Sequence, residues 1–474
     1  MTGTTGEGLE AGSGSLQDFI DSQPDLARYF YSCEGAPHAS RRPGASPVPA
    51  EFSNWFEEQQ AWRQSAVLFD QSHHMPELFL KGPDALRLLD HIGVNDLAHF
   101  APGRAKQFVG CTRQGLMIGD CILHHHGDAG FELISGMPLL NWVHYHAETG
   151  GYDVEVRRDH DTPTNPAGRR TNFRFGMDGP RAGAIFGEAV DGSAPSIKFF
   201  NTARVRIAGR DVLALRHGMA GHQGVELSGA YEDGPAVRAA LMEAGARHGL
   251  KQGGTRAYFS SVVESGWIAY PLPAIYTAPD LADYRRWLPA NGWEARMQLA
   301  GSFFSPDLEA YYTNPFEMGY ARIVSFDHDF VGRTALEEMA RRPQRQKVTL
   351  AWNSEDVSAI FGSLFADELP YKTFELPTAN YGFPHMDQVL DRGGRRVGIG
   401  RGASYSANER AMLSLAIVDP GVAEPGTELT LLWGEPDGGS AKPSVARHRQ
   451  FPVRVTVGPA PYARAARAMK RAGI

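Results

Sequence analysis

Three consecutive histidines form the first group in this sequence that could do chemistry. His124, His125 and His126 offer imidazole nitrogens of the kind that bind zinc. Consecutive residues on a strand point to opposite faces of a sheet, so we do not expect these rings to converge on one ion. Gly127 and Asp128 follow directly and favour an exposed turn. The sequence therefore predicts no metal site.

A glycine pattern near the C-terminus imitates a dinucleotide-binding fingerprint. Gly398, Gly400 and Ala403 have a similar spacing, and Asp419 stands near the place of a ribose-binding acid. The segment lies within a run of predicted strands, which leaves little room for a crossover helix. The sequence contains no H-E-x-x-H, G-x-S-x-G or P-loop motif. The usual metalloenzyme, hydrolase and nucleotide-binding signals are therefore absent.

Composition is that of a globular protein of several domains. The chain has 474 residues, which is too long for one ordinary core, and 42% of them are hydrophobic. Its 54 acidic and 47 basic residues are interspersed and give a net charge of -7, which disfavours nucleic acid as a partner.

The uncharged stretch 265–279 is too short to span a bilayer and contains three prolines, so we expect no membrane segment. No signal peptide is evident, and three cysteines without framework spacing suit the cytoplasm.

Short strands and helices alternate as far as about residue 340. We expect residues 1–50 to be a flexible extension and linker with one helical patch, and a helix capped by Ser53 or Asn54 to follow it. Strands are predicted over 67–69, 77–80, 107–110, 117–123 and 131–135, and a helix over 84–92. Cys111 and Cys121 fall among these strands and are expected to be inert core thiols.

The composition changes after residue 341 to alternating strands with turn residues between them. The predicted strands are 347–353, 394–400, 412–418, 428–434 and 452–457. We therefore expect an α+β protein with an extension (1–50), a core of two interleaved subdomains (51–340) and a β-rich barrel or sandwich (341–474).

Longer strings resemble the aminomethyltransferase (T-protein) superfamily of the glycine cleavage system. The stretch from Leu68 to Met75 is similar to its F-D-x-S-H-M signature. Further matches follow in the family's order, at 94–97, 115–120, 225–227, 329–333, 397–402 and 405–406. The resemblance implies a three-domain cloverleaf and assigns the apparent dinucleotide fingerprint to the terminal β domain.

Within the superfamily the sequence most resembles the tetrahydrofolate-dependent aryl O-demethylases. The likeness runs from about Tyr29 to Tyr462 and includes AWRQSAVLFDQSHHM, LRHGMAG, PLPAIYT and FDHDFVGR. It implies transfer of a methyl group from a methoxylated aromatic compound to N5 of tetrahydrofolate. The expected substrate is a small lignin-derived molecule such as syringate, vanillate, 3-O-methylgallate or guaiacol, and the expected state is a monomer or weak homo-oligomer.

The resemblance also implies roles for particular residues. Tyr258 is expected to protonate the departing ether oxygen, while Tyr31 and His74 orient the ring hydroxyl or tune the acid. A phenol suits this role because its pKa of about 10 is near that of the departing group. Tetrahydrofolate is expected to bind Glu226 through its pterin amino and ring N–H groups, with Trp267 and Met75 beside the ring.

Two positions depart from the family pattern. The T-protein has a catalytic aspartate where our alignment places Gly119, and Asp120 matches a second aspartate with an expected structural hydrogen bond. We therefore expect the aminomethyl mechanism to be lost. Gly136 replaces an arginine thought to hold the substrate carboxylate in the vanillate enzyme, which leaves the methyl donor open.

Other readings of the sequence stay open. A folate-binding protein without methyl transfer is one, although its typical K-G-C-Y-x-G-Q-E motif is absent. A demethylase acting on a methylated sulfonium is another.

Overall fold

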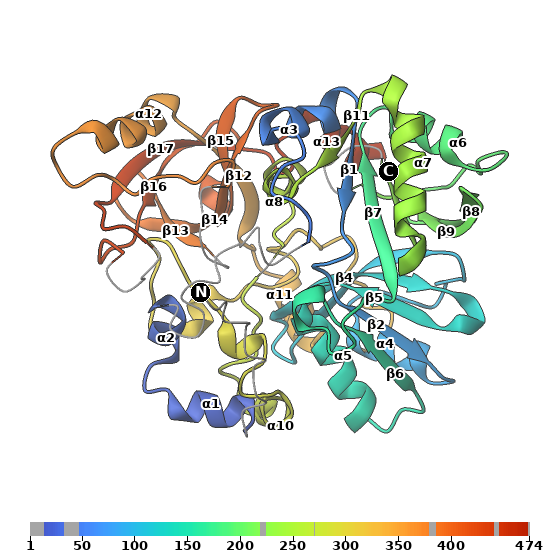
Figure 1. The fold of residues 1–474 in the computed structure, drawn as a ribbon. Helices are drawn as coiled ribbons and strands as arrows, with labels where there is room; N and C mark the ends of the chain where they lie inside the picture. Colours follow the sequence, from blue (N-terminus) through green and yellow to red (C-terminus); the bar gives the residue numbers. More distant parts are fainter. Residues whose placement is uncertain are drawn as a thin grey trace, which may run out of the picture.

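The computed structural model describes residues 14–32, 47–218, 224–269, 271–378, 385–439 and 445–472. Residues 1–13 and 33–46 of the flexible extension and linker expected at 1–50, Cys33 among them, lie outside the described residues. The described chain forms two sheets and a closed barrel, with the barrel on one side of the molecule and the sheets on the other (Figure 1).

The first sheet has the strand order β11-β1-β7-β10-β9-β8. Its strands are β1 (Ala66–Asp70), β7 (Asn172–Asp178), β8 (Thr202–Ile207), β9 (Arg210–Leu215), β10 (Gly224–Ala230) and β11 (Leu250–Gly253). β1 and β11 pair in parallel, and the other neighbours are antiparallel. Helices α6 (Ala182–Ala189) and α7 (Gly234–Gly245) bury apolar side chains against this sheet.

The second sheet is antiparallel, with the order β3-β4-β5-β2-β6. It contains β2 (Glu77–Lys81), β3 (Ala105–Cys111), β4 (Met117–His125), β5 (Phe131–Ile134) and β6 (Glu155–Asp159). Helices α4 (Ala85–Ile92) and α5 (Met137–Thr149) cover one of its faces. The chain enters the first sheet with β1, builds the second and then returns to the first, so the two sheets are interleaved in sequence.

The C-terminal part is a closed antiparallel barrel of order β12-β15-β14-β13-β16-β17. Its strands are β12 (Gln346–Trp352), β13 (Met386–Leu390), β14 (Arg396–Ser406), β15 (Ala411–Val418), β16 (Glu428–Trp433) and β17 (Phe451–Gly458). Helix α11 (Arg333–Ala340) precedes the barrel, α12 (Ser354–Gly362) packs against its core, and α13 (Arg464–Ala472) follows it. The α+β class and the β-rich C-terminal part are confirmed.

The N-terminal helices differ from the flexible extension that we expected. Helices α1 (Leu16–Ser22) and α2 (Leu26–Ser32) bury Leu16, Phe30 and Tyr31 in the core that includes the second sheet. The helical patch is therefore present but packed, because its apolar side chains have a partner surface.

Four further helices lie outside the two sheets and the barrel. Helix α3 (Trp55–Gln64) begins at the Asn54 cap, whose side chain accepts a hydrogen bond from the backbone N–H of Glu57 at 2.9 Å. α3 lies beside α8 (Thr255–Ser260), between the barrel and the first sheet in the view of Figure 1; α9 (Val262–Ser265) contacts α8, and α10 (Ala282–Trp287) contacts α1. Within the described residues, every helix is too short or too polar to cross a membrane.

Candidate active site

One cavity collects the three residues expected to bind the cofactor. Met75, Glu226 and Trp267 all line it, together with Asp120 and Gly136. Its volume is about 210 Å³, far more than the ~10–15 Å³ that a single water needs. Its walls come from the β1–β2 connection, β4, β10 and the segment after α9, so both sheets contribute. The cavity can therefore accept a ring-sized ligand.

Glu226 supplies a buried negative charge to this cavity. It lies on β10, is 4% exposed, and its Oε1 is 2.6 Å from Nδ1 of His217. Burial works against the charge, but His217, with Arg174 and His124 farther away, lowers the pKa of Glu226 below its ordinary value. Glu226 is therefore a carboxylate at neutral pH, which suits a ligand that presents N–H donors.

Asp120 is a second carboxylate in the cavity wall. Trp267 Nε1 and the Tyr320 hydroxyl donate to its Oδ2 at 3.0 Å and 2.9 Å, and Gln107 Nε2 donates to the same atom. Burial raises the pKa of Asp120 to about 6, although the hydrogen bonds from Tyr320 and Trp267 partly oppose the rise. A carboxyl group with this pKa exchanges a proton readily near neutral pH.

This placement corrects our interpretation of Gly119. A Cβ built on Gly119 would lie 3.3 Å from the Cβ of Leu139, so the side chain at this position faces α5. Successive strand residues point to opposite faces, and Asp120 faces the cavity instead. The structural hydrogen bonds expected for Asp120 are present, and Asp120 also brings a carboxylate to the cavity wall, a placement that the sequence did not predict.

Tyr258 and His74 form a hydrogen-bonded pair. The Tyr258 hydroxyl lies 3.0 Å from Nε2 of His74, and their rings meet edge to face with centroids 4.9 Å apart. Tyr258 is 8% exposed on α8 and packs against Phe69 of β1. Burial lowers the pKa of His74 to about 4, despite the opposing charge of Asp70, so its ring is neutral at pH 7. A neutral imidazole can hold the hydroxyl of Tyr258 without removing its proton.

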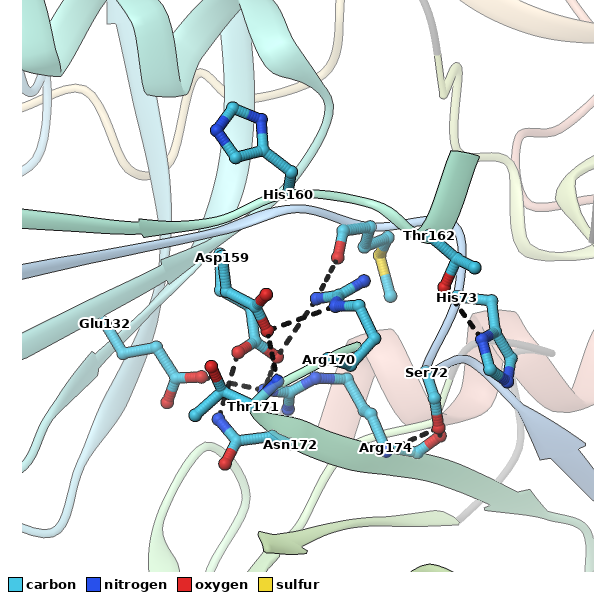
Figure 2. Close-up of polar contacts among 12 residues, drawn as sticks. Ser72, His73, Glu132, Asp159, His160, Thr162, Arg170, Thr171, Asn172 and Arg174 are labelled. Atoms are coloured by element: carbon cyan, nitrogen blue, oxygen red, sulfur yellow. Dashed lines mark hydrogen bonds and ion pairs between the residues drawn. The ribbon is translucent and has the colours of Figure 1, made fainter. Parts of the chain in front are cut away.

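A buried network of charges holds the loop that carries His74 and Met75. Arg170 Nη2 donates to the carbonyl of Met75 at 2.9 Å, and its Nε donates to Asp159. The backbone N–H of Arg174 donates to Ser72 Oγ at 2.9 Å. Figure 2 shows both arginines beside the carboxylates of Asp159 and Glu132. The loop is therefore anchored on the strand β7 and on the segment that leads into it.

The loop is held at a third point by hydrogen bonds from Thr162. Its backbone N–H donates to the carbonyl of His73 at 2.9 Å, and its Oγ1 lies 2.9 Å from His73 Nδ1 (Figure 2). These contacts flank His74 on its N-terminal side and leave its ring directed to Tyr258.

Tyr31 occupies different surroundings from the pair. Its hydroxyl donates to the carbonyl of Gly301 at 2.8 Å, and its ring meets Phe304 edge to face. Burial, followed by the charge of Glu435, raises the pKa of Tyr31 well above its ordinary value. Tyr31 therefore keeps its proton, and its contact with the substrate stays a prediction.

Gly136 lies in the cavity wall as expected from its alignment with the substrate-binding arginine. It is the N-cap of α5, and its backbone is extended. The cavity consequently has no cation at this position.

The three histidines also need a correction. His124 and His126 are two positions apart, and their rings stack with centroids 5.5 Å apart. His124 is 1% exposed, so it does not lie in an exposed turn. The alternation of side chains separates His125 from its neighbours but brings His124 and His126 to one face.

Comparison with known proteins identifies the family of this chain. The family model described as the GCVT N-terminal domain matches residues 30–272. The chain belongs to the GCVT family.

Two relatives extend over nearly the whole length of this GCVT protein. Syringate O-demethylase of Sphingobium sp. (strain NBRC 103272 / SYK-6) is 44% identical over 453 residues, which cover 96% of this chain and 97% of that protein. Sesamin methylene transferase of Sinomonas sp. (strain No.22) is 30% identical, covering 88% of this chain and 90% of that protein. The crystal structure of aminomethyltransferase T from Bartonella henselae matches with a TM-score of 0.58 and 17% identity, over 88% of this chain and 91% of that one. That structural match shows the shared fold.

Sequence reasoning missed three members of this GCVT site. His217, Gln107 and Tyr320 all line the cavity, and the last two hydrogen-bond Asp120. Tyr320 is 200 residues from Asp120 in the sequence, and no local pattern marks it. Strict alternation along β4 would have placed Asp120 on the opposite face from Gly119.

Proposed function

We propose that this protein transfers a methyl group from a methoxylated aromatic compound to tetrahydrofolate, releasing a phenol and 5-methyltetrahydrofolate. The observation that carries the proposal is the hydrogen-bonded Tyr258–His74 pair, whose His74 directly precedes Met75 in the wall of the cavity that Glu226 and Trp267 also line. The 44% identity to a syringate O-demethylase supports the same reaction class.

The residues of the cavity fit a pterin. Glu226 is buried and ionised, so it can accept hydrogen bonds from amino and ring N–H groups. Trp267 and Met75 offer apolar surface for the ring. Tetrahydrofolate, when bound, supplies the N5 nucleophile that takes the methyl group.

Two side chains of the protein act in proton transfer during this reaction, one as the donor and one as the acceptor. Tyr258 gives its proton to the aryl oxygen as the methyl C–O bond breaks, so the product leaves as a neutral phenol. Asp120 would hold the proton that N5 of bound tetrahydrofolate releases, which balances the proton that Tyr258 gives up. Each proton transfer of this kind is typically worth about 10² to 10⁴ in rate.

The finding at Asp120 removes one argument against an aminomethyltransferase, because a carboxylate does stand in the cavity. The demethylase proposal rests instead on Tyr258 with His74 and on overall similarity. An aminomethyltransferase of Saccharopolyspora erythraea is only 24% identical over 384 residues. We propose a syringate-like acid as the substrate, bound without a cation at position 136.

The decisive experiment supplies purified protein with tetrahydrofolate and, in turn, syringate, vanillate, 3-O-methylgallate and guaiacol. We expect stoichiometric 5-methyltetrahydrofolate and phenol with at least one of them, measured by chromatography with mass detection. Binding of tetrahydrofolate without product from any methoxyarene would contradict the proposal. It would favour a folate-binding protein, or a sulfonium demethylase if a methylated sulfonium gave product.

Replacing Glu226 with glutamine should weaken tetrahydrofolate binding. The change keeps the shape but removes the charge, and hydrogen bonds to charged groups contribute about 1.5–3 kcal/mol. We expect Kd to rise about 10- to 100-fold, measured by quenching of tryptophan fluorescence.

The matched control for this change is Glu368→Gln, at an exposed glutamate paired with Arg449. It should leave Kd unchanged. An unaltered Kd in Glu226→Gln would remove Glu226 from the cofactor site.

A further inference from the structure

Two histidines and a glutamate meet on one face of the second sheet. His124 and Glu132 are partners across the β4–β5 ladder, and His126 follows the end of β4. The potential ligand atoms of the three residues all lie within 4.8 Å of one another. We refer to His124, His126 and Glu132 as the His-His-Glu cluster.

His124 is the member of the cluster whose surroundings demand a ligand. Its side chain is 1% exposed, and neither ring nitrogen has a hydrogen-bond partner within the part of the chain that the structure describes. Buried polar groups are normally satisfied, so an isolated imidazole in a sheet core needs an explanation. The nearby nitrogen of His126 and carboxylate of Glu132 suggest what that ligand is.

The donor set is that of a divalent transition metal. Two imidazole nitrogens and one carboxylate oxygen form one of the three-ligand sets found at open zinc sites, where water takes the fourth position. His126 Nε2 now lies 2.7 Å from Glu132 Oε2, and this separation must widen to about 3.3 Å around an ion bound at ~2.0 Å. His126 is partly exposed at the end of β4, where such an adjustment is small.

A charged neighbour of the cluster, Arg174, holds the carboxylate of Glu132 in position. Glu132 uses its other oxygen, Oε1, to accept from Arg174 Nη2 at 2.9 Å, so Oε2 remains for the ion. Arg174 also pairs with Glu77 at 3.0 Å, which offsets its positive charge. Hydrogen-bonded carboxylate ligands of this kind are usual at metal sites.

We propose that His124, His126 and Glu132 bind one divalent transition-metal ion, with zinc the best match to the donors. The ion joins β4 to β5 on the face of β4 that carries Asp120. Its role is to hold this wall of the cavity, and its binding does not depend on the proposed methyl transfer.

The test measures metal binding by the full chain without substrate. After dialysis against a chelator, the protein should take up one equivalent of zinc, measured by elemental analysis and calorimetry. Zinc should raise Tm, and cobalt should give the visible spectrum of a low-symmetry four- or five-coordinate site. His124→Asn and His126→Gln should each raise Kd by about 100-fold or more.

His248→Gln is the matched control, because His248 also pairs with a glutamate, Glu188, at 2.9 Å but forms no metal-ligand group with a second histidine among the residues that the structure describes. This variant should keep the full zinc affinity. If His124→Asn fails to fold, His126→Gln alone decides, since His126 is partly exposed. Absence of binding to the wild-type chain at micromolar zinc overturns the proposal, and so does unchanged affinity in His126→Gln.

Discussion

Replacing Tyr258 with phenylalanine is expected to lower kcat by about 10²- to 10⁴-fold, the usual contribution of a general acid. The change removes one oxygen atom, the one that lies 3.0 Å from His74 Nε2. The ring still fills its place against Phe69, so the fold should persist. Because Glu226 and Trp267 are untouched, Kd for tetrahydrofolate should stay within about twofold of the wild-type value. Single-turnover formation of 5-methyltetrahydrofolate measures the chemical step directly.

Tyr276→Phe provides the control for this experiment. Tyr276 is also buried and its hydroxyl donates to the carbonyl of Glu294 at 2.9 Å, within the core that includes the second sheet. Losing that bond should cost about 1 kcal/mol of stability and leave kcat unchanged. Equal rates for wild type and Tyr258→Phe would show that Tyr258 is not the acid.

Asp120→Asn should reduce kcat by about 10²- to 10⁴-fold, because an amide cannot accept the proton that N5 loses. The wild-type rate should also depend on pH in a defined direction. Burial raises the pKa of Asp120 to about 6, so the group becomes protonated as pH falls through 6 and can no longer act as a base. We therefore expect kcat to fall below about pH 6, and the residual activity of Asp120→Asn to lack that limb.

Tyr320→Phe distinguishes this role from a structural one. The hydroxyl of Tyr320 donates to Asp120 Oδ2 and lowers the pKa of Asp120, so its removal should shift the acid limb to higher pH. A purely structural aspartate would give a lower rate with an unmoved limb. That outcome would assign the N5 proton to another base.

Much of the fold could be predicted from local sequence. Short apolar runs and alternating segments between turn residues located β1 to β5 and five of the six barrel strands. β6 to β11, β13 and α12 were not located individually. The strand β13 has only five residues, and two of them are the polar Asp387 and Gln388.

The site was only partly predictable. The family motif located Tyr258, His74, Met75, Glu226 and Trp267, since each lies within a matching string. The direction of the side chain at position 119 depends on the pairing of β4 with β3, where the register shifts at Gly110 and Cys111. The convergence of His124 with Glu132 depends on the β4–β5 register, which no single segment encodes.

The parallel pairing of β1 with β11 has a consequence for how the protein is made. Phe69 lies opposite Gly253, so β1 leaves the ribosome long before its partner exists. At ~5–20 residues per second, the delay is about 10 to 40 s. β7 pairs with the other edge of β1, so the edge that β11 will occupy stays unpaired during that interval, and an unpaired apolar strand edge promotes aggregation. Slow translation, or loss of the C-terminal half, is therefore expected to lower the solubility of the chain before it lowers its activity.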